Sequence, residues 1–348
     1  MISSRNIFLC TTEYHLLLSL HIICSFYGSK EFENLIVMTT GIRINVCTYD
    51  SSVLSNVRMV YIDWYELRSY PIITDFLEIQ CNNFFYYLSN FPVHRYIVRC
   101  LSKKGTKIIL VQDGLKPYVE IQNDKLRIIL SNIYLNFREC LKLHYFSGIF
   151  RPYNNSRYVN DKHINEVWLT HPNSFFHKID ANQSITTIPE FSAKSIQICS
   201  SYFKYNLQIH FQPNSILYIT QPLFNTEHKL AEIHFLKNFL SKYKNRDLYI
   251  KFHPSRDMDK NLLYKELSQA KFLENVYFPA ELIIQNMNNA IIMSLYSTAL
   301  LFNNPKCRFY FTYPILNNNL RQKIPVPNPI DHIKVISNVN EIQFYAEE

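Results

Sequence analysis

Short apolar runs rich in β-branched residues alternate along the chain with longer segments of helical periodicity. In the first half, strands are predicted at 7–10, 35–39, 57–62, 107–112 and 167–170, and helical patterns at 14–26 and 72–102. Continuous apolar strands are typical of parallel sheets that helices cover on both faces. The first half therefore predicts one doubly wound α/β domain.

The periodicity weakens between about residues 182 and 214 and then begins again. Beyond this break, strands are predicted at 216–220, 248–253, 290–293 and 308–311, with helices at 227–243, at 260–270 and from Thr298, and a further segment at 276–284. We therefore predict two domains, 1–190 and 191–348. Ligands of open α/β sheets bind at the carboxyl ends of the strands, so we expect a ligand cleft between the two sheets.

The composition fits this organisation. With 348 residues and 47% hydrophobic content, the chain is long enough for two buried sheets. Its eight cysteines are scattered without C-x-x-C pairs, which favours free thiols in a reducing cytoplasm. Glu13 and His15 interrupt the apolar run from Ile7, so the sequence predicts neither a signal peptide nor a membrane span.

The formal net charge of +8 leaves several interpretations open. A modest basic excess is compatible with nucleic acid, an anionic membrane face, an acidic substrate or simple solubility. No internal repeat or long charge block decides among them. We expect no nucleic-acid partner, and peripheral contact with the cytoplasmic face of the inner membrane stays open.

The first candidate for chemistry is Asp113, which the apolar run 107–112 delivers to the carboxyl edge of the first sheet, followed by a sharp turn at Gly114. A carboxylate at this place can act as a general base for an attacking hydroxyl. An Asp-Gly turn after a strand is also common without any catalytic role, and taken alone that interpretation is favoured.

The second candidate is the run from Leu248 to Ser255. Period-2 alternation places Lys251 and His253 on the same face of one strand, and Pro254 ends that strand. Such a junction suits a phosphate group, which a helix N-terminus also attracts. A second His-Pro pair, His171-Pro172, follows another predicted strand, and we interpret it as structural or as part of an acceptor side.

The third candidate is the hydroxyl-rich turn 294–298. Ser297 and Thr298 lie at a predicted helix start, where they either cap the helix or hold a phosphate. Glu281 lies between the second and third candidates. Its carboxylate can accept hydrogen bonds from ribose hydroxyls, or it can be an ordinary acidic residue at a helix N-terminus.

In this order and spacing, Gln112-Asp113-Gly114, His253-Pro254 and Ser297-Thr298 resemble the motifs of bacterial sialyltransferases of glycosyltransferase family 52 and of the related capsular polysialyltransferases. The opening segment 7–18 resembles the first strand and helix of those enzymes, whose loop borders the acceptor. The resemblance implies a GT-B fold, with two Rossmann-like domains facing each other across a cleft. The first domain would then carry the acceptor side and the second the nucleotide-sugar donor side.

The resemblance also implies roles for individual residues. Asp113 would be the base, and His253 would bind the CMP phosphate and assist its departure. The other implied donor-binding residues are Lys251, Pro254, Glu281, Ser297 and Thr298, and the implied acceptor-side residues are Thr12, Glu13, Tyr14 and Gly114. Gln112 replaces the first acidic residue of the family pattern, which keeps the base but changes its electrostatic setting.

The activity implied is a single inverting displacement that moves sialic acid, or a related nonulosonic acid, from CMP to a hydroxyl of lipopolysaccharide, lipooligosaccharide or capsule. We expect no metal cofactor, because cationic and hydroxyl donors can balance the one phosphate of CMP. Asp257-Met-Asp259 has the spacing of a metal-binding D-x-D, but it directly follows Pro254 at a predicted helix start, where acidic residues are favoured anyway.

Three alternatives remain open at this level. The chain could use another nucleotide sugar, it could be a GT-B-like sugar-nucleotide epimerase or hydrolase, or it could bind glycans without catalysis. The sequence does not specify the acceptor glycan, the linkage formed or the oligomeric state. It also does not specify whether one sugar residue or a polymer is added.

Overall fold

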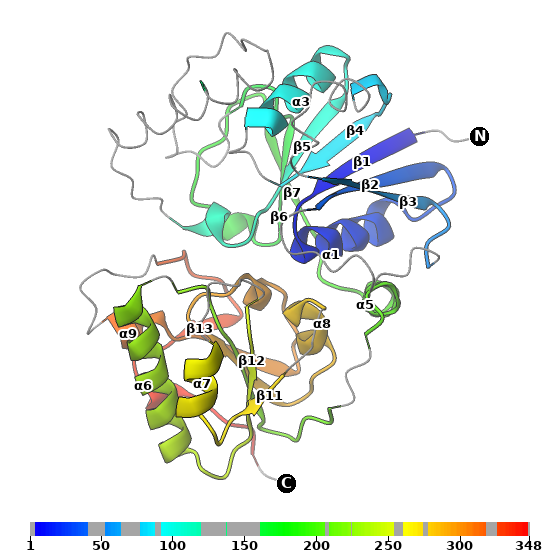
Figure 1. Ribbon diagram of the computed structural model, residues 1–348. Helices are drawn as coiled ribbons and strands as arrows, with labels where there is room; N and C mark the ends of the chain where they lie inside the picture. Colours follow the sequence, from blue (N-terminus) through cyan, green and yellow to red (C-terminus); the bar gives the residue numbers. More distant parts are fainter. Residues whose placement is uncertain are drawn as a thin grey trace. The chain divides into compact units, whose positions relative to one another are not determined.

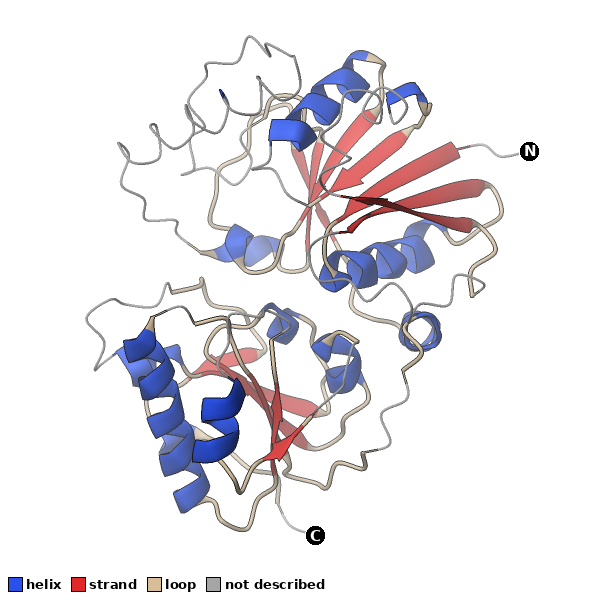
Figure 2. Ribbon diagram, in the orientation of Figure 1, coloured by secondary structure: helices blue, strands red, loops and turns tan. Residues whose placement is uncertain are grey.

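The computed structural model describes residues 4–40, 53–63, 77–87, 92–119, 137, 161–205, 209–223, 225–253, 260–273, 278–317 and 326–346. The chain divides into two compact units, Met1–Lys204 and Tyr205–Glu348 (Figure 1). Among the residues described, each unit shows one parallel sheet with helices packed against it (Figure 2). The units divide later in the chain than the predicted boundary at residue 190, because helix α5 (Ala193–Tyr202) packs against α1 (Glu13–Ile22) of the first unit.

The first unit contains a seven-stranded sheet in the order β3-β2-β1-β4-β5-β6-β7. Its strands, paired in parallel throughout, are β1 (Ser4–Cys10), β2 (Phe32–Thr40), β3 (Val57–Asp63), β4 (Asn83–Tyr86), β5 (Lys107–Val111), β6 (Glu166–Leu169) and β7 (Ser184–Thr187). The order reverses beside β1, as in doubly wound sheets.

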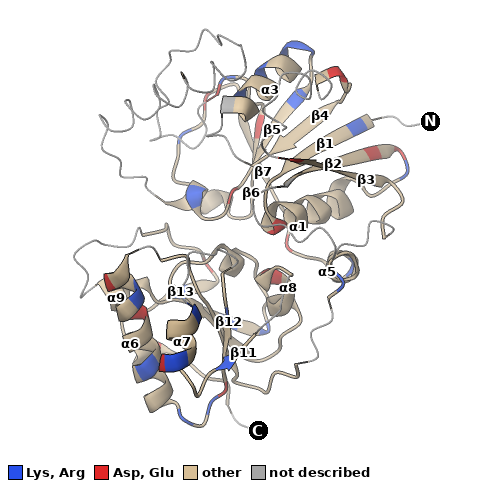
Figure 3. Ribbon diagram, viewed as in Figure 1, with Lys and Arg blue, Asp and Glu red and all other residues tan. Residues whose placement is uncertain are grey.

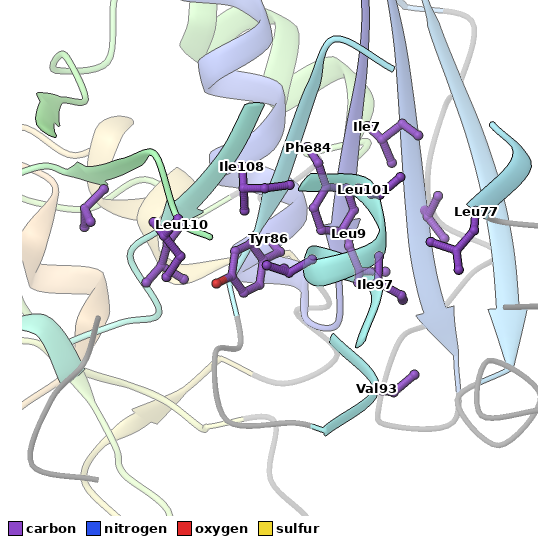
Figure 4. Packing of buried hydrophobic residues seen from close by; sticks show 14 of the residues in the cluster. Ile7, Leu9, Leu77, Phe84, Tyr86, Val93, Ile97, Leu101, Ile108 and Leu110 are labelled. Carbon is purple, nitrogen blue, oxygen red and sulfur yellow. The ribbon is translucent and has the colours of Figure 1, made fainter. Parts of the chain in front are cut away.

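Helices α1 and α3 (Pro92–Lys103) cover opposite faces of this sheet (Figure 1). Alternation along the strands explains the division, since side chains at i and i+2 share one face. The α3 face is an apolar cluster drawn from the helix and the five adjacent strands β2, β1, β4, β5 and β6, of which Figure 4 labels Ile7, Leu9, Phe84, Tyr86, Ile108, Leu110, Ile97 and Leu101. The other face carries Phe8 stacked on Phe85, with ring centroids 4.3 Å apart.

A ladder of asparagines links three neighbouring strands in the amino half of the same sheet. Asn6 Nδ2 donates to Asn34 Oδ1 at 2.9 Å, and Asn83 Nδ2 donates to Asn6 Oδ1 at 2.8 Å. Asn6 is the register partner of both residues, and Asn34 Nδ2 also donates to the Tyr27 carbonyl. Because Asn6 and Asn34 are fully buried, each of these hydrogen bonds satisfies an amide that would otherwise lose its contact with water.

The second unit contains a six-stranded parallel sheet in the order β10-β9-β8-β11-β12-β13. Its strands are β8 (Ile216–Ile219), β9 (Leu248–Lys251), β10 (Lys271–Phe272), β11 (Ala290–Ser294), β12 (Cys307–Phe311) and β13 (Ile333–Val335). Its α-helices are α6 (Thr226–Lys242), α7 (Lys260–Glu266), α8 (Ala280–Gln285) and α9 (Tyr313–Asn317). Helices α6 and α7 lie on one side of this sheet and α8 on the other (Figure 1).

Several predicted elements differ from the structure. The stretch 72–102, predicted as helical, contains strand β4, whose buried aromatic residues continue the sheet beside β1. The region after 182, where no element was predicted, forms β7 and α5. The strand predicted to reach His253 ends at Lys251, and the helix predicted from Thr298 is one turn of 3₁₀-helix, Thr298–Leu301.

Charged residues lie mainly on helices and strand ends, and the sheet interiors carry few of them (Figure 3). The described cysteines, Cys10, Cys24, Cys81, Cys100, Cys199 and Cys307, are free thiols. Among the described residues, no helix has both the length and the apolar content needed to cross a membrane.

Candidate functional site

Asp113 lies at the carboxyl edge of the first sheet, two residues beyond the end of β5. The turn predicted at Gly114 is present, with a φ of 65°, a conformation that glycine adopts without steric cost. The turn leads directly into the short 3₁₀-helix η4 (Lys116–Tyr118). The backbone thus returns Lys116 toward the carboxylate that precedes it.

Both oxygens of Asp113 are engaged. His15 Nε2 lies 3.1 Å from Oδ1, and Lys116 Nζ forms an ion pair with Oδ2. The Asp113 side chain is 17% exposed, so it reaches solvent while most of it is buried. Burial raises the pKa of the carboxyl, but the hydrogen bond from His15 and the charge of Lys116 outweigh that effect and lower the pKa to about 2. Asp113 is therefore a stable carboxylate at neutral pH.

His15 is held rigidly in the first turn of α1. Its Nδ1 accepts the Thr11 backbone N–H at 3.2 Å and lies 2.9 Å from Thr11 Oγ1. Its ring stacks on Tyr87, with centroids 4.3 Å apart and planes 8° apart. Burial lowers the pKa of His15 more than its contact with Asp113 raises it, so the imidazole is neutral at physiological pH.

Gln112, the residue that departs from the family pattern, is fully buried and makes four hydrogen bonds. Its Oε1 accepts from the Tyr118 hydroxyl at 2.6 Å and from the Thr170 N–H and hydroxyl at 2.8 and 3.0 Å. Its Nε2 donates to the Tyr14 hydroxyl at 2.8 Å. The amide thus ties the ends of β5 and β6 to helix α1 immediately beside Asp113.

The predicted acceptor-side residues lie around this carboxylate. Thr12 is the N-cap of α1, and its hydroxyl accepts the His15 N–H at 3.2 Å. Glu13 and Tyr14 follow in the first turn, both half-buried. His171, after β6, donates its backbone N–H to the Tyr118 hydroxyl at 3.2 Å. The structure therefore gathers the Thr12–Tyr14 turn, Asp113, Gly114 and His171 at one sheet edge.

A second polar cluster lies at the carboxyl edge of the other sheet, where β9, β8 and β11 are neighbours. Lys251 ends β9 and is buried, and the His253 N–H donates to Thr220 Oγ1 at 2.9 Å. Ser294 ends β11, and its hydroxyl donates to the Ile219 carbonyl at 2.8 Å. His253 lies two residues beyond the end of β9 and so has no strand partner there. The hydrogen bond to the Thr220 side chain holds the His253 backbone in its place.

Glu281 lies in the first turn of α8 and is 5% exposed. Burial raises the pKa of its carboxyl to about 7, although the positive charge of Lys251 acts in the opposite direction. The structure thus brings Lys251 and Glu281 within electrostatic reach of each other. A carboxyl that titrates near neutral pH can either donate or accept a hydrogen bond.

Ser297 is the N-cap of the 3₁₀-helix at 298–301, and its hydroxyl accepts the Ala299 N–H at 3.3 Å. Thr298 begins that helix and is half-buried. Ser297 thus caps the helix, as one of the two interpretations expected. Its hydroxyl accepts in this contact, so the same hydroxyl can also donate a hydrogen bond. Pro254, Asp257 and Asp259 lie outside the described residues, and within the described ranges no group of three His, Cys, Asp or Glu residues is arranged to hold a metal.

Three participants were not singled out from the sequence: His15, Lys116 and Thr220. His15 and Lys116 each lie within three residues of a predicted site residue, so their short sequence separation from Tyr14 and Asp113 was the available signal. Thr220 directly follows the apolar strand β8, much as Asp113 follows β5, and the same strand-end rule points to it. The contacts of His15 with Asp113 and of Thr220 with His253 depend on the order of the strands in each sheet, and the local sequence pattern does not specify that order.

A model of the family described as alpha-2,8-polysialyltransferase matches residues 6–306. The chain belongs to this family. As a member of the alpha-2,8-polysialyltransferase family it is a sialyltransferase, and hence a glycosyltransferase, which confirms the relationship predicted from the motifs. No curated protein matches the sequence.

Solved structures agree on the fold. The α/β-galactoside α-2,3-sialyltransferase of Photobacterium phosphoreum is 13% identical with a TM-score of 0.55, over 97% of this chain and 99% of that one. The 2,6-sialyltransferase of Photobacterium sp. JT-ISH-224, in ternary complex with CMP and lactose, is 13% identical with a TM-score of 0.50, over 89% and 71%. The S. aureus MnaA–UDP co-structure is 11% identical with a TM-score of 0.50, over 84% and 74%. The predicted fold class, two Rossmann-like α/β domains of the GT-B type, is confirmed.

Proposed function

We propose that this polysialyltransferase family member transfers sialic acid, or a related nonulosonic acid, from its CMP-activated form to a hydroxyl of a surface glycan such as lipopolysaccharide, lipooligosaccharide or capsule. Family membership supports the sugar. The Photobacterium sp. enzyme of the same fold, which was crystallised with CMP and lactose, supports a CMP donor and a glycan acceptor.

The observation that carries the proposal is the ionised Asp113 carboxylate at the carboxyl edge of its sheet. In this mechanism the acceptor hydroxyl attacks the anomeric carbon, its proton passes to Asp113, and the bond to the CMP phosphate breaks with inversion. A carboxylate with a low pKa is a sufficient base, because the attacking oxygen becomes strongly acidic as its bond to carbon forms.

The leaving group would be held by the second unit. Lys251 and His253 would balance the charge of the CMP phosphate, and Ser297 and Thr298 would donate hydroxyl hydrogen bonds to it. Glu281 would accept hydrogen bonds from the ribose hydroxyls. Because these donors suffice for one phosphate, the proposed reaction uses no metal.

The proposed place of action is the bacterial cytoplasm, where nucleotide sugars are made, with peripheral contact to the inner membrane. The net charge of +8 favours contact with an anionic surface. Nucleic acid is not among the proposed partners.

The decisive experiment measures thermal stabilisation by CMP, UDP and GDP, followed by a screen of CMP-activated nonulosonic acids with mass-spectrometric detection of glycan products. We expect stabilisation by CMP alone and a product that gains one or more sugar residues. Because the S. aureus MnaA–UDP co-structure shares the fold, stabilisation by UDP would replace the donor assignment with another nucleotide sugar. Turnover of a sugar nucleotide without any acceptor would indicate an epimerase or a hydrolase instead.

A further inference from the structure

The two oxygens of Asp113 are held by very different partners. Oδ1 contacts His15, whose side chain is 1% exposed, whereas Oδ2 contacts Lys116, whose side chain is 51% exposed. A buried imidazole within a packed core keeps one position, while an exposed lysine side chain has four rotatable bonds and a strongly hydrated head. Only the Oδ2 side can therefore exchange its partner at low cost.

The hydrogen-bond pattern fixes the tautomer of His15. The Thr11 backbone N–H can only donate, so His15 Nδ1 accepts and carries no proton. In a neutral imidazole the other nitrogen then carries the hydrogen, and Nε2–H donates to Asp113 Oδ1. Protonation of Nδ1 would place two donors against each other, and burial of the ring disfavours the charged form as well.

The surroundings of the ring leave it little freedom. Tyr87 stacks on one face, and the Tyr87 hydroxyl lies 2.6 Å from Ser19 Oγ, one turn further along the same helix. Tyr14 meets the ring edge-on with centroids 5.9 Å apart. The titratable groups that face His15 are thus Asp113 and Lys116 from the turn after β5, Tyr14 from its own helix and Tyr87 from directly after β4.

We propose that His15 is the positioning residue of the base: its neutral Nε2–H fixes Oδ1 of Asp113 so that Oδ2 points to the acceptor hydroxyl, which takes the place of Lys116. The inference rests on the proposed role of Asp113. The acceptor proton moves to Oδ2, and no proton passes to His15, because its Nδ1 already accepts the Thr11 N–H. The imidazole therefore orients the carboxylate and keeps it ionised without entering the proton transfer.

The test compares two variants of His15. His15→Phe keeps the stack on Tyr87 but removes the donor, whereas the amide of His15→Gln can place a nitrogen where Nε2 lies. The matched control is His21→Phe, further along the same helix, because His21 is likewise buried and stacked on an aromatic ring, Phe191, with centroids 4.1 Å apart. All variants are compared by circular dichroism and thermal unfolding before kinetics.

For His15→Phe we expect kcat to fall about 10²-fold, the scale of a misplaced reacting group, with the KM for the CMP-sugar unchanged. The acidic limb of the kcat/KM profile should move to higher pH, since a contact that lowers the pKa of Asp113 is gone. His15→Gln should recover most of kcat and the original profile. His21→Phe should leave the profile in place.

Two results would overturn the inference. Either His15→Phe keeps the kcat and pH profile of the wild type, or His15→Gln loses as much as His15→Phe with no shift of the acidic limb, which would mean that the ring only packs. Asp113→Asn separates this from failure of the proposed function. If Asp113→Asn still transfers sugar, the base assignment itself is wrong, whatever the His15 variants do.

Discussion

Asp113 in the first unit and Glu281 in the second are both largely buried acids close to a lysine, yet the pKa values of their carboxyl groups lie far apart. The pKa of Asp113 lies at about 2, and that of Glu281 lies at about 7. Asp113 receives a direct hydrogen bond from His15 and a contact ion pair from Lys116, whereas Glu281 has a hydrogen bond from its own backbone N–H and only the through-space charge of Lys251. Two side-chain donors at contact distance, one of them charged, thus keep a buried carboxyl ionised where one backbone hydrogen bond and a more distant charge do not.

The largest effect is expected for Asp113→Asn, which removes the proposed base and keeps the shape of the side chain. Activity should fall by about 10²–10⁴-fold, the contribution typical of a positioned base, while CMP binding is retained. Initial rates and calorimetric titration with CMP measure both. Asp247→Asn is the control, since this carboxylate precedes β9 and pairs with Lys271 on the surface. An active Asp113→Asn enzyme would remove Asp113 from the chemistry.

Glu281→Gln tests the high pKa of Glu281 through the pH dependence of the free energy of unfolding. Because folding raises the pKa of Glu281 from 4.5 to about 7, its contribution is complete below pH 4.5 and is lost as pH rises through about 7. The raised pKa implies about 3 kcal/mol. We expect Glu281→Gln to stabilise the protein at pH 8 by about 2 kcal/mol, because the variant no longer buries an ionised carboxylate, and less than the full effect because Lys251 loses its opposite charge. Urea unfolding between pH 5 and 8 measures it.

Glu232→Gln is the matched control for Glu281→Gln. Glu232 is also fully buried, burial raises its pKa to about 7, and it accepts from the Tyr218 hydroxyl at 2.6 Å, which the amide oxygen of glutamine can do as well. This variant should flatten the same part of the stability profile without changing CMP affinity. Loss of stability at pH 8 in both variants would contradict the high pKa of these carboxyls.

His253→Ala should weaken CMP binding about tenfold, the scale of one hydrogen bond to a charged group, and lower the transfer rate with it. His234→Ala is the control, because His234 is exposed on α6. Calorimetric titration with CMP reports the difference. An equal loss of CMP affinity in His253→Ala and Asp113→Asn would contradict the division of roles between the two units.

The smallest effect is expected for Gln112→Glu, which restores the acidic residue of the family pattern. The Tyr118 hydroxyl and both Thr170 donors can serve a carboxylate, and the Tyr14 hydroxyl can turn to donate. A second negative charge beside Asp113 raises the pKa of the base, so the acidic limb should move to higher pH with rates near pH 8 changed about threefold or less. By contrast, Gln112→Leu should destabilise the protein, since it orphans the buried donors.

The sequence predicted most of the sheet strands, because buried parallel strands are continuous apolar runs. It did not predict β4, since four aromatic and polar residues within a longer amphipathic stretch match a helix equally well. Strands β7, β10 and β13 have two to four residues each and depend on pairing with a neighbour, which no local pattern encodes.

Strand ends also led to Asp113, Lys251 and His253 as candidates. The partners that set their chemistry were harder to predict. Lys116 returns to Asp113 only because Gly114 adopts a positive φ, and His15 reaches it from 98 residues away through the position of β1 relative to β5. Ser297 shows the opposite case, where the simpler capping contact is the one that the structure contains.

The asparagine ladder lies in the amino half of the first sheet, yet it affects the position of Asp113 at the carboxyl edge. A slip of β1 by a single residue would move its carboxyl end by about 3.3 Å. Such a displacement would break the 3.1 Å hydrogen bond between His15 Nε2 and Asp113 Oδ1. The asparagine side chains thus help to fix the position of His15 against Asp113 by fixing the register of β1. Substitution of Asn6 would then disturb the catalytic carboxylate while the rest of the sheet stays in place.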